Sequence, residues 1–221
     1  MKRLPTGTDA VNSAYKNAMS RIEGQVADQV ELAKNVLAWV VCARKRLTVL
    51  QLQHALAVEI GETYLDQDNL PEIEDMVSVC AGLVTTDARG GIVRLVHHTA
   101  QTYFEQTWMD WFPDAHSKIA ATCITYLSFD IYKTEFQQTL SMEQLFGFSR
   151  VAPMGDFEAF LKQYPLYTYS ARYWATHCYI GQGSHELVLS LLRDDTKSLH
   201  AAKRWQSERK SSGAHPLLLC I

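Results

Sequence analysis

The amino-acid sequence predicts a mainly helical protein, in which three helices and a β-hairpin are followed by an all-helical bundle. Apolar residues recur at helical spacing through most of the 221 residues. Only residues 83–96 have the two-residue period of strands, on both sides of a glycine turn. Hydrophobic residues make up 47% of the chain and charged residues 20%, a balance that allows a buried core and argues against wholesale disorder.

The first part of the chain has the expected elements of a winged helix. A lead-in helix is expected at residues 8–23, and the three helices of the domain at 26–43, 48–58 and 72–82. Thr48 and Gln51 have the spacing of a capping box at the start of the second of these three. Strands at 83–88 and 92–96 surround the turn Arg89-Gly90-Gly91. Three helices followed by a β-hairpin are the order of a winged helix.

Helical patterns dominate the rest of the chain. They cover residues 99–109, 114–130, 141–148, 156–163, 166–180, 185–194 and 196–209. Pro113, Pro165, Gly181 and Gly183 mark breaks between them. We therefore expect four segments: a lead-in helix at 1–24, a winged-helix domain at 25–112, a helical domain at 113–210 and a short C-terminal segment at 211–221.

Composition and cysteine spacing favour a cytoplasmic protein without a metal site. The five cysteines form no C-x-x-C pair, and Cys42, Cys80 and Cys123 lie in apolar helical patterns, as buried free thiols do. Val36–Ala43 is the longest apolar stretch and is too short to span a bilayer. The polar N-terminal residues do not resemble a signal peptide. With a net charge of −3, the chain has no overall attraction to nucleic acid or to an anionic membrane.

The sequence also argues against catalysis by this chain. None of the 11 glycines lies in a phosphate-binding loop with Gly-Lys-Ser/Thr. Leu187–Asp195, an apolar run that ends in acidic residues, is better explained as an amphipathic helix than as a magnesium-binding segment. The histidines lack a metal-binding spacing such as H-E-x-x-H. We expect no enzyme activity, no catalytic or metal-binding residue and no cofactor of its own.

Several segments resemble one family when their order and spacing are taken together. They are Tyr15 with Ala18–Gln25, Leu32–Trp39, Leu47–Glu59, Val96–Phe104, Cys123–Leu127, and Tyr164–Trp174 with His177. They resemble the region between the NACHT domain and the ankyrin repeats of fungal STAND-type signalling NTPases, over residues from about 10 to 195. The last residues, with Gly213 and His215-Pro216-Leu217-Leu218, resemble the truncated start of an ankyrin repeat, with His in place of Thr.

This resemblance implies a non-catalytic regulatory and interaction module. The winged helix would pack on the NTPase core and sense its nucleotide state, and the helical part would link that state to C-terminal repeats. The implied partners are an intramolecular NACHT domain, ankyrin repeats and other proteins. ADP or ATP would be bound by the full-length protein. The alternative is a free-standing winged-helix protein that binds other proteins or DNA.

His97 and His98 are the candidate site residues. They lie where the second wing strand passes into a helix. In the wider class of signalling NTPases, a histidine at this junction contacts the β-phosphate of ADP, and the resemblance assigns that role to His97. An imidazole N–H can donate to a phosphate oxygen. Other members often have Asp after this histidine, whereas His98 follows it here. The alternative is that one histidine packs and the other faces solvent.

Two further features have plainer interpretations. The aromatic residues Tyr164, Tyr167, Tyr169, Tyr173 and Trp174 could form a binding platform, but core packing explains them better. The third helix, which reads DNA in many winged helices, carries Glu72, Glu74 and Asp75 near its start. These carboxylates would face phosphates, so we do not expect nucleic acid as a partner. We do not expect a membrane as a partner either.

Overall fold

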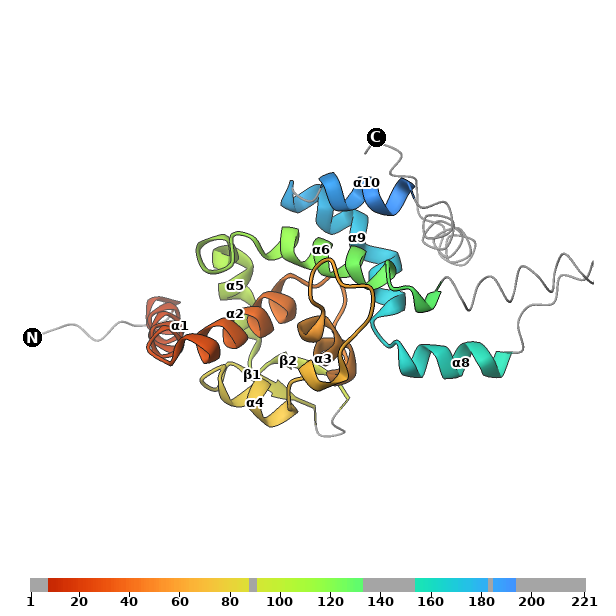
Figure 1. The fold of residues 1–221 in the computed structure, drawn as a ribbon. Helices are drawn as coiled ribbons and strands as arrows, with labels where there is room; N and C mark the ends of the chain where they lie inside the picture. Colours follow the sequence, from red (N-terminus) through yellow and green to blue (C-terminus); the bar gives the residue numbers. More distant parts are fainter. Residues whose placement is uncertain (1–7, 88–90, 133–153, 183–184, 194–221) are drawn as a thin grey trace, which may run out of the picture. The chain divides into compact units, whose positions relative to one another are not determined.

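The computed structural model describes residues 8–87, 91–132, 154–182 and 185–193. Its elements are, in order, α1 Thr8–Glu23, α2 Ala27–Cys42, α3 Val49–Ala57, the 3₁₀ helix η1 Gln67–Asn69, α4 Ile73–Ser78, β1 Val84–Thr86, β2 Val93–Leu95, α5 His98–Trp111, α6 Ala115–Leu127, α8 Met154–Gln163, α9 Tyr167–Gly181 and α10 His185–Arg193 (Figure 1). This order confirms a mainly helical protein with a two-stranded wing. The helices expected at 141–148 and 196–209 lie outside the described residues.

The chain divides into two compact units. The first contains the described residues up to Leu56 together with Asn69–Ala115. It therefore includes α1, α2, most of α3, α4, the wing and α5. The second contains Ala57–Asp68 and the described residues from His116 onward, with α6, α8, α9 and α10. Each unit has its own buried side chains and is described separately below.

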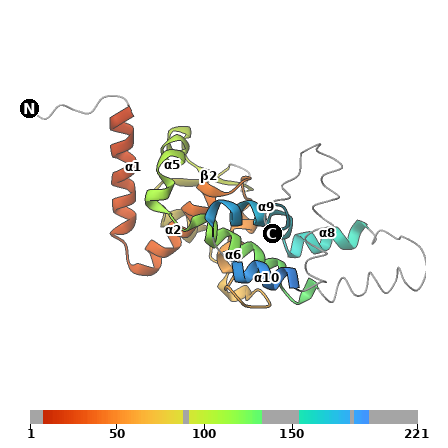
Figure 2. The same ribbon diagram turned by 90° about the horizontal axis from the view of Figure 1, so that it is seen from above.

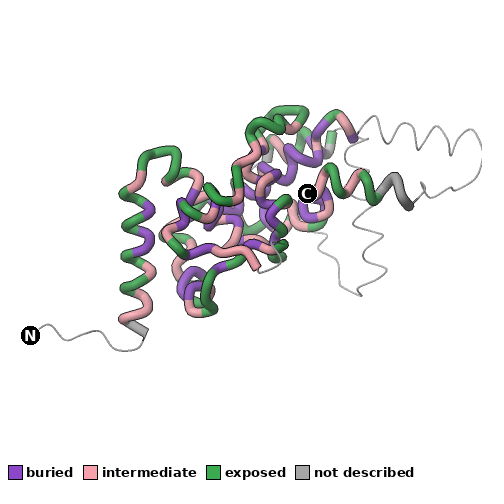
Figure 3. The backbone as a smooth tube through the Cα atoms, turned by 90° about the horizontal axis from the view of Figure 1, so that it is seen from below, coloured by how far each residue is buried: buried purple, intermediate pink, exposed green. Residues whose placement is uncertain are grey.

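Helix α2 is the centre of the first unit and packs against α1, α4, α5 and β2. It buries Ala33, Val36, Leu37, Trp39 and Cys42. Their spacing of three and four residues places most of them on one face, as the apolar pattern predicts. The chain turns sharply between α1 and α2 (Figure 2). Along α1, buried and exposed positions alternate, so one side of this helix packs on the unit (Figure 3).

The wing is an antiparallel pair of strands. Val84 pairs with Leu95, and Thr86 pairs with Val93. The residues before α3 extend the pairing, because the Val93 N–H donates to the Leu47 carbonyl and the Val49 N–H donates to the Gly91 carbonyl. The sequence pattern did not predict this third stretch, which is too short to have a period of its own. These two hydrogen bonds connect the start of α3 to the wing.

The predicted capping box at the start of α3 is present. The Gln51 N–H donates to Oγ1 of Thr48 over 3.2 Å, and the Thr48 N–H donates to Oε1 of Gln51 over 3.1 Å. Two N–H groups that the helix itself leaves without a partner are thus satisfied reciprocally. Thr48 also forms a bridge with Ile92 of the wing, so one residue serves both the helix and the sheet.

The third helix of the domain is shorter than predicted. The expected helix at 72–82 is observed as α4, which ends at Ser78. Ala81 and Gly82 have φ angles of 49° and 81°, in the left-handed region that a right-handed helix cannot use. Gly82 adopts this φ without steric cost, and the turn that results leads directly into β1.

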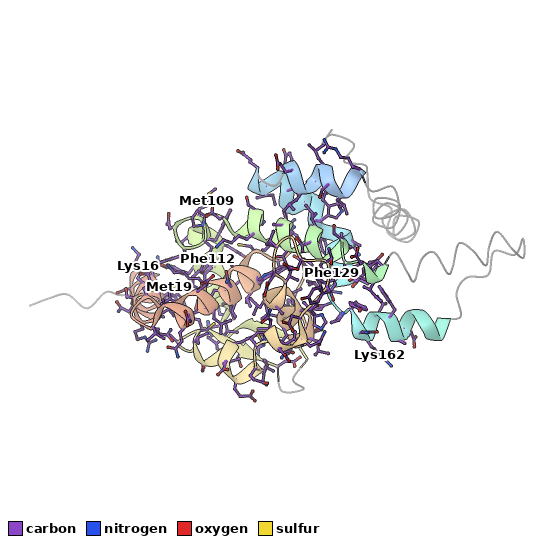
Figure 4. The ribbon with its side chains drawn as sticks, in the orientation of Figure 1. Lys16, Met19, Met109, Phe112, Phe129 and Lys162 are labelled. Carbon is purple, nitrogen blue, oxygen red and sulfur yellow. The ribbon has the colours of Figure 1, made fainter. Side chains whose placement is uncertain are left out.

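The second unit has an aromatic core. Its fully buried side chains include Ile119, Ile124, Tyr126, Phe129 and Leu166. Six aromatic rings from α6, α8 and α9 and the residues beside them contact one another: Tyr126, Phe129, Tyr132, Phe160, Tyr164 and Tyr167. Figure 4 labels Phe129 here, and Met19 and Phe112 among the buried side chains of the first unit. Because Tyr167 and Tyr169 are buried, the prediction of core packing is confirmed for these two.

Candidate functional site

The candidate site is the junction between β2 and α5. The Val96 N–H donates to the Leu83 carbonyl, so the strand pairing continues to the end of the wing. His97 then has extended φ and ψ angles of −141° and 148° and is the N-cap residue of α5, while His98 is the first helical residue. Both histidines are exposed. The alternative expectation was that one of them packs and the other faces solvent. It is not observed, because neither side chain lies in the core.

The His97 side chain caps its own helix. Its Nδ1 lies 3.3 Å from the backbone nitrogen of Thr99 and 2.9 Å from Oγ1 of the same residue. A backbone N–H can only donate, so Nδ1 accepts and carries no proton. The neutral ring therefore holds its proton on Nε2. This leaves one N–H donor on His97 that α5 does not use.

Tyr15 of α1 completes this polar group. Its hydroxyl oxygen lies 2.6 Å from Oγ1 of Thr99. The Tyr15 ring is held by Tyr103 and Phe104 of α5, with centroid separations of 5.3 and 6.5 Å. Sequence reasoning missed both Tyr15 and Thr99 as members of the site. Because 84 residues separate them, nothing in the local pattern predicts this contact.

The second histidine lies against the first. The His97 and His98 ring centroids are 4.2 Å apart with an interplanar angle of 37°. The first turn of α5 contains no acidic residue, whereas the first turn of α4 contains Glu74 and Asp75. The positive end of a helix dipole attracts anions. The start of α5 is thus electrostatically suited to an anion, and the start of α4 is not.

The surface that could read DNA carries the wrong charge. Helix α4 has six residues, and Glu72, Glu74 and Asp75 at its start are exposed. Among the described residues of the wing, Arg94 is exposed as well. The start of α4 thus presents three exposed carboxylates.

A second polar cluster lies inside the helical unit, and sequence reasoning missed it. Nδ1 of His116 on α6 lies 2.7 Å from Nδ1 of His177 on α9. Nε2 of His177 lies 2.9 Å from the Tyr169 hydroxyl oxygen. His177 is fully buried, and His116 is 7% exposed. The two histidines are 61 residues apart, so their pairing has no sequence pattern. Burial makes this cluster a packing element rather than a binding site.

In the part of the chain that the structure describes, no three His, Cys, Asp or Glu side chains are grouped as metal ligands would be. Among the same residues, no helix has the length and apolar character needed to cross a bilayer.

Three helices and a two-stranded wing, followed by further helices, define a winged-helix domain with a helical extension. Residues 21–122 match the family model described as GPI inositol-deacylase, winged helix domain. The match begins in α1 and ends within α6, so it includes the wing and the histidine junction. No curated protein and no solved structure matches the chain. The chain thus contains a winged-helix domain, which is consistent with a protein-interaction module.

Proposed function

We propose that this chain is a non-catalytic regulatory and interaction module of a NACHT-type signalling NTPase. In this proposal the winged helix packs on an NTPase core and responds to the nucleotide bound there, as ADP or ATP. The helical unit transmits that state to C-terminal repeats. The observation that carries the proposal is His97, an exposed ring whose Nε2–H is left as a donor at the start of α5.

The chemistry of this junction fits a phosphate group. The Nε2–H of His97 would donate to a phosphate oxygen, and a hydrogen bond to a charged acceptor is stronger than one between neutral groups. The dipole of α5, a helix of 14 residues, adds a favourable field at the same end. Since Nδ1 is occupied by Thr99, the ring is held in one orientation before any nucleotide arrives. Pre-ordering of this kind reduces the entropy lost on binding.

The alternative of a DNA-binding winged helix has less support. It requires α4 to approach phosphates with Glu72, Glu74 and Asp75 exposed at its start. Repulsion between these carboxylates and the phosphates of DNA would weaken binding, and the repulsion is stronger at low salt. A free-standing protein-interaction module remains compatible with a winged helix, but it gives no role to the His97 donor.

The test is the rate of ADP release from a longer protein that carries the NTPase domain before this chain. His97→Ala removes the proposed donor, and a hydrogen bond to a charged group contributes about 1.5–3 kcal/mol. ADP should therefore leave roughly ten- to a hundredfold faster, and the protein should shift toward its open, oligomeric state. Stopped-flow fluorescence with a labelled ADP measures the rate directly.

His98→Ala is the matched control, because His98 is also exposed and lies beside His97. It should change ADP release far less. Equal release rates for the unmodified protein and His97→Ala would overturn the sensor role. A large effect of His98→Ala alone would assign the role to the other histidine.

A further inference from the structure

We infer that Tyr15 and Thr99 are positioning residues that hold His97 as its Nε2–H tautomer and connect the lead-in helix α1 to that ring. The inference rests on the proposed role of His97 as the nucleotide contact. It adds two residues to that site, from α1 and from the first turn of α5. Neither residue would touch the nucleotide, because both act through the far side of the imidazole, at Nδ1.

The direction of each hydrogen bond follows from the donors available. The Thr99 backbone N–H donates to Nδ1 of His97 over 3.3 Å, a long hydrogen bond that favours the bare form of that nitrogen without fixing it. In the bare form, the Thr99 hydroxyl, 2.9 Å from the same nitrogen, donates to it as well. A hydroxyl has one proton, so Thr99 cannot also donate to Tyr15. The Tyr15 hydroxyl therefore donates to Oγ1 of Thr99 over 2.6 Å.

The chain of donors thus runs from Tyr15 to Thr99 to His97, and it ends with the Nε2–H of His97, which donates to none of the described residues. Hydrogen bonds in such a series polarise one another, so each strengthens the next. The bond between Tyr15 and Thr99 is partly buried, which protects it from exchange with water. A shift of α1 would withdraw the Tyr15 proton, and the Thr99 hydroxyl could then turn away from the ring. Movement of α1 is in this way translated into the orientation of His97.

Nuclear magnetic resonance of the 221-residue chain with ¹⁵N-labelled histidine tests the relay without nucleotide. Two-bond ¹H–¹⁵N spectra distinguish a bare Nδ1 from a protonated one. We expect Nδ1 of His97 to be bare in the unmodified chain, and Tyr15→Phe and Thr99→Val to give a mixture of tautomers. Thr99→Ser, which keeps the hydroxyl, should behave as the unmodified chain does. Tyr15→Phe keeps the ring contacts with Tyr103 and Phe104, so its fold should persist.

The release of ADP from the longer protein separates the two ideas. If the relay and the sensor role both hold, Tyr15→Phe speeds ADP release several-fold, less than His97→Ala does, and Thr99→Ser has no effect. If the tautomer of His97 is the same with Tyr15→Phe and Thr99→Val as without them, the inference is overturned, whatever His97→Ala does. If the tautomer changes while neither Tyr15→Phe nor His97→Ala alters release, the positioning is supported and the sensor role is wrong.

Discussion

Nδ1 of His116 and Nδ1 of His177 are 2.7 Å apart, which requires one of these nitrogens to carry a proton and the other to accept it. The rings are stacked, with centroids 4.9 Å apart. If His177 accepts at Nδ1, its Nε2–H donates to the Tyr169 hydroxyl; if it donates, Nε2 accepts from that hydroxyl. Either arrangement ties the start of α6 to the last turns of α9 through buried polar atoms.

Replacing His177 should therefore destabilise the chain more than the loss of one side chain's packing would. His177→Leu fills much of the same space with an apolar side chain. It removes a buried hydrogen-bond partner from both His116 and Tyr169, and each such loss costs about 1–3 kcal/mol. We expect the free energy of unfolding in urea to fall by about 2–4 kcal/mol. Tyr179→Leu, at a position 70% exposed on the same helix, should change it by less than about 0.5 kcal/mol. Equal stability of the two variants would contradict the role of the pair.

Close backbone approach at the end of α9 gives a second prediction. Oγ of Ser117 donates to the Gly181 carbonyl over 2.7 Å, and a Cβ added at Gly181 would lie 2.5 Å from the Ser117 backbone nitrogen. Gly181→Ala must push α6 and α9 apart, at a cost of about 1–3 kcal/mol. Gly24→Ala is the control, since its Cβ would be 3.5 Å from the nearest atom, an ordinary contact. A thermal unfolding midpoint lowered only for Gly181→Ala is the expected result, and equal midpoints would refute it.

The sequence predicts those parts of the fold that local pattern controls. Apolar spacing located α2 and α5 to within a few residues, and the Thr48 to Gln51 spacing predicted a capping box that is present. The two-residue period located the wing strands. In each case the pattern lies within the residues of the element itself. The apolar face that the element buries can therefore be recognised from the sequence.

The rest depends on contacts between distant residues. The short pairing of Leu47 and Val49 with the wing shows no period, and the early end of α4 depends on a backbone turn at Ala81. The histidine junction could be located from the sequence, but its partner Tyr15 could not. Such contacts form only when helices from different parts of the chain pack together. The histidine pair in the helical unit was missed for the same reason.

Acid should lower the free energy of unfolding of the first unit through protonation of His54. This residue on α3 is 6% exposed, and its burial lowers the pKa of the imidazole below the usual value near 6.5. As pH falls below about 6.5, the unfolded chain binds a proton at His54 before the folded chain does, so the free energy of unfolding decreases. The slope from one such group is at most about 1.4 kcal/mol per pH unit. Once pH is below the folded pKa, both states hold the proton and the loss stops.

His54→Gln isolates this contribution from those of the other histidines. Urea unfolding of both proteins at several pH values between 7 and 5 gives the two stability curves. The variant should have a flatter curve, because Gln does not titrate. Parallel curves for the two proteins would show that His54 is protonated equally in the folded and unfolded chain.

The cysteines should divide into slow and fast groups toward alkylating reagents. Burial raises the pKa of the Cys42, Cys80 and Cys123 thiols to about 12, while Cys178 is only partly buried. The thiolate is the reactive form, and at pH 8 a thiol with a pKa of 12 is ionised in about one part in ten thousand. Its reaction with iodoacetamide should therefore be slower by roughly three orders of magnitude than that of an ordinary thiol, even before restricted access is considered.

Peptide mass spectrometry after timed labelling should find Cys178 modified well before the other three. In urea, where burial is lost, all four should react at similar rates. Rapid labelling of Cys80 in the folded chain would contradict the prediction, since its Sγ lies 3.2 Å from the Met76 carbonyl oxygen in the interior of the first unit.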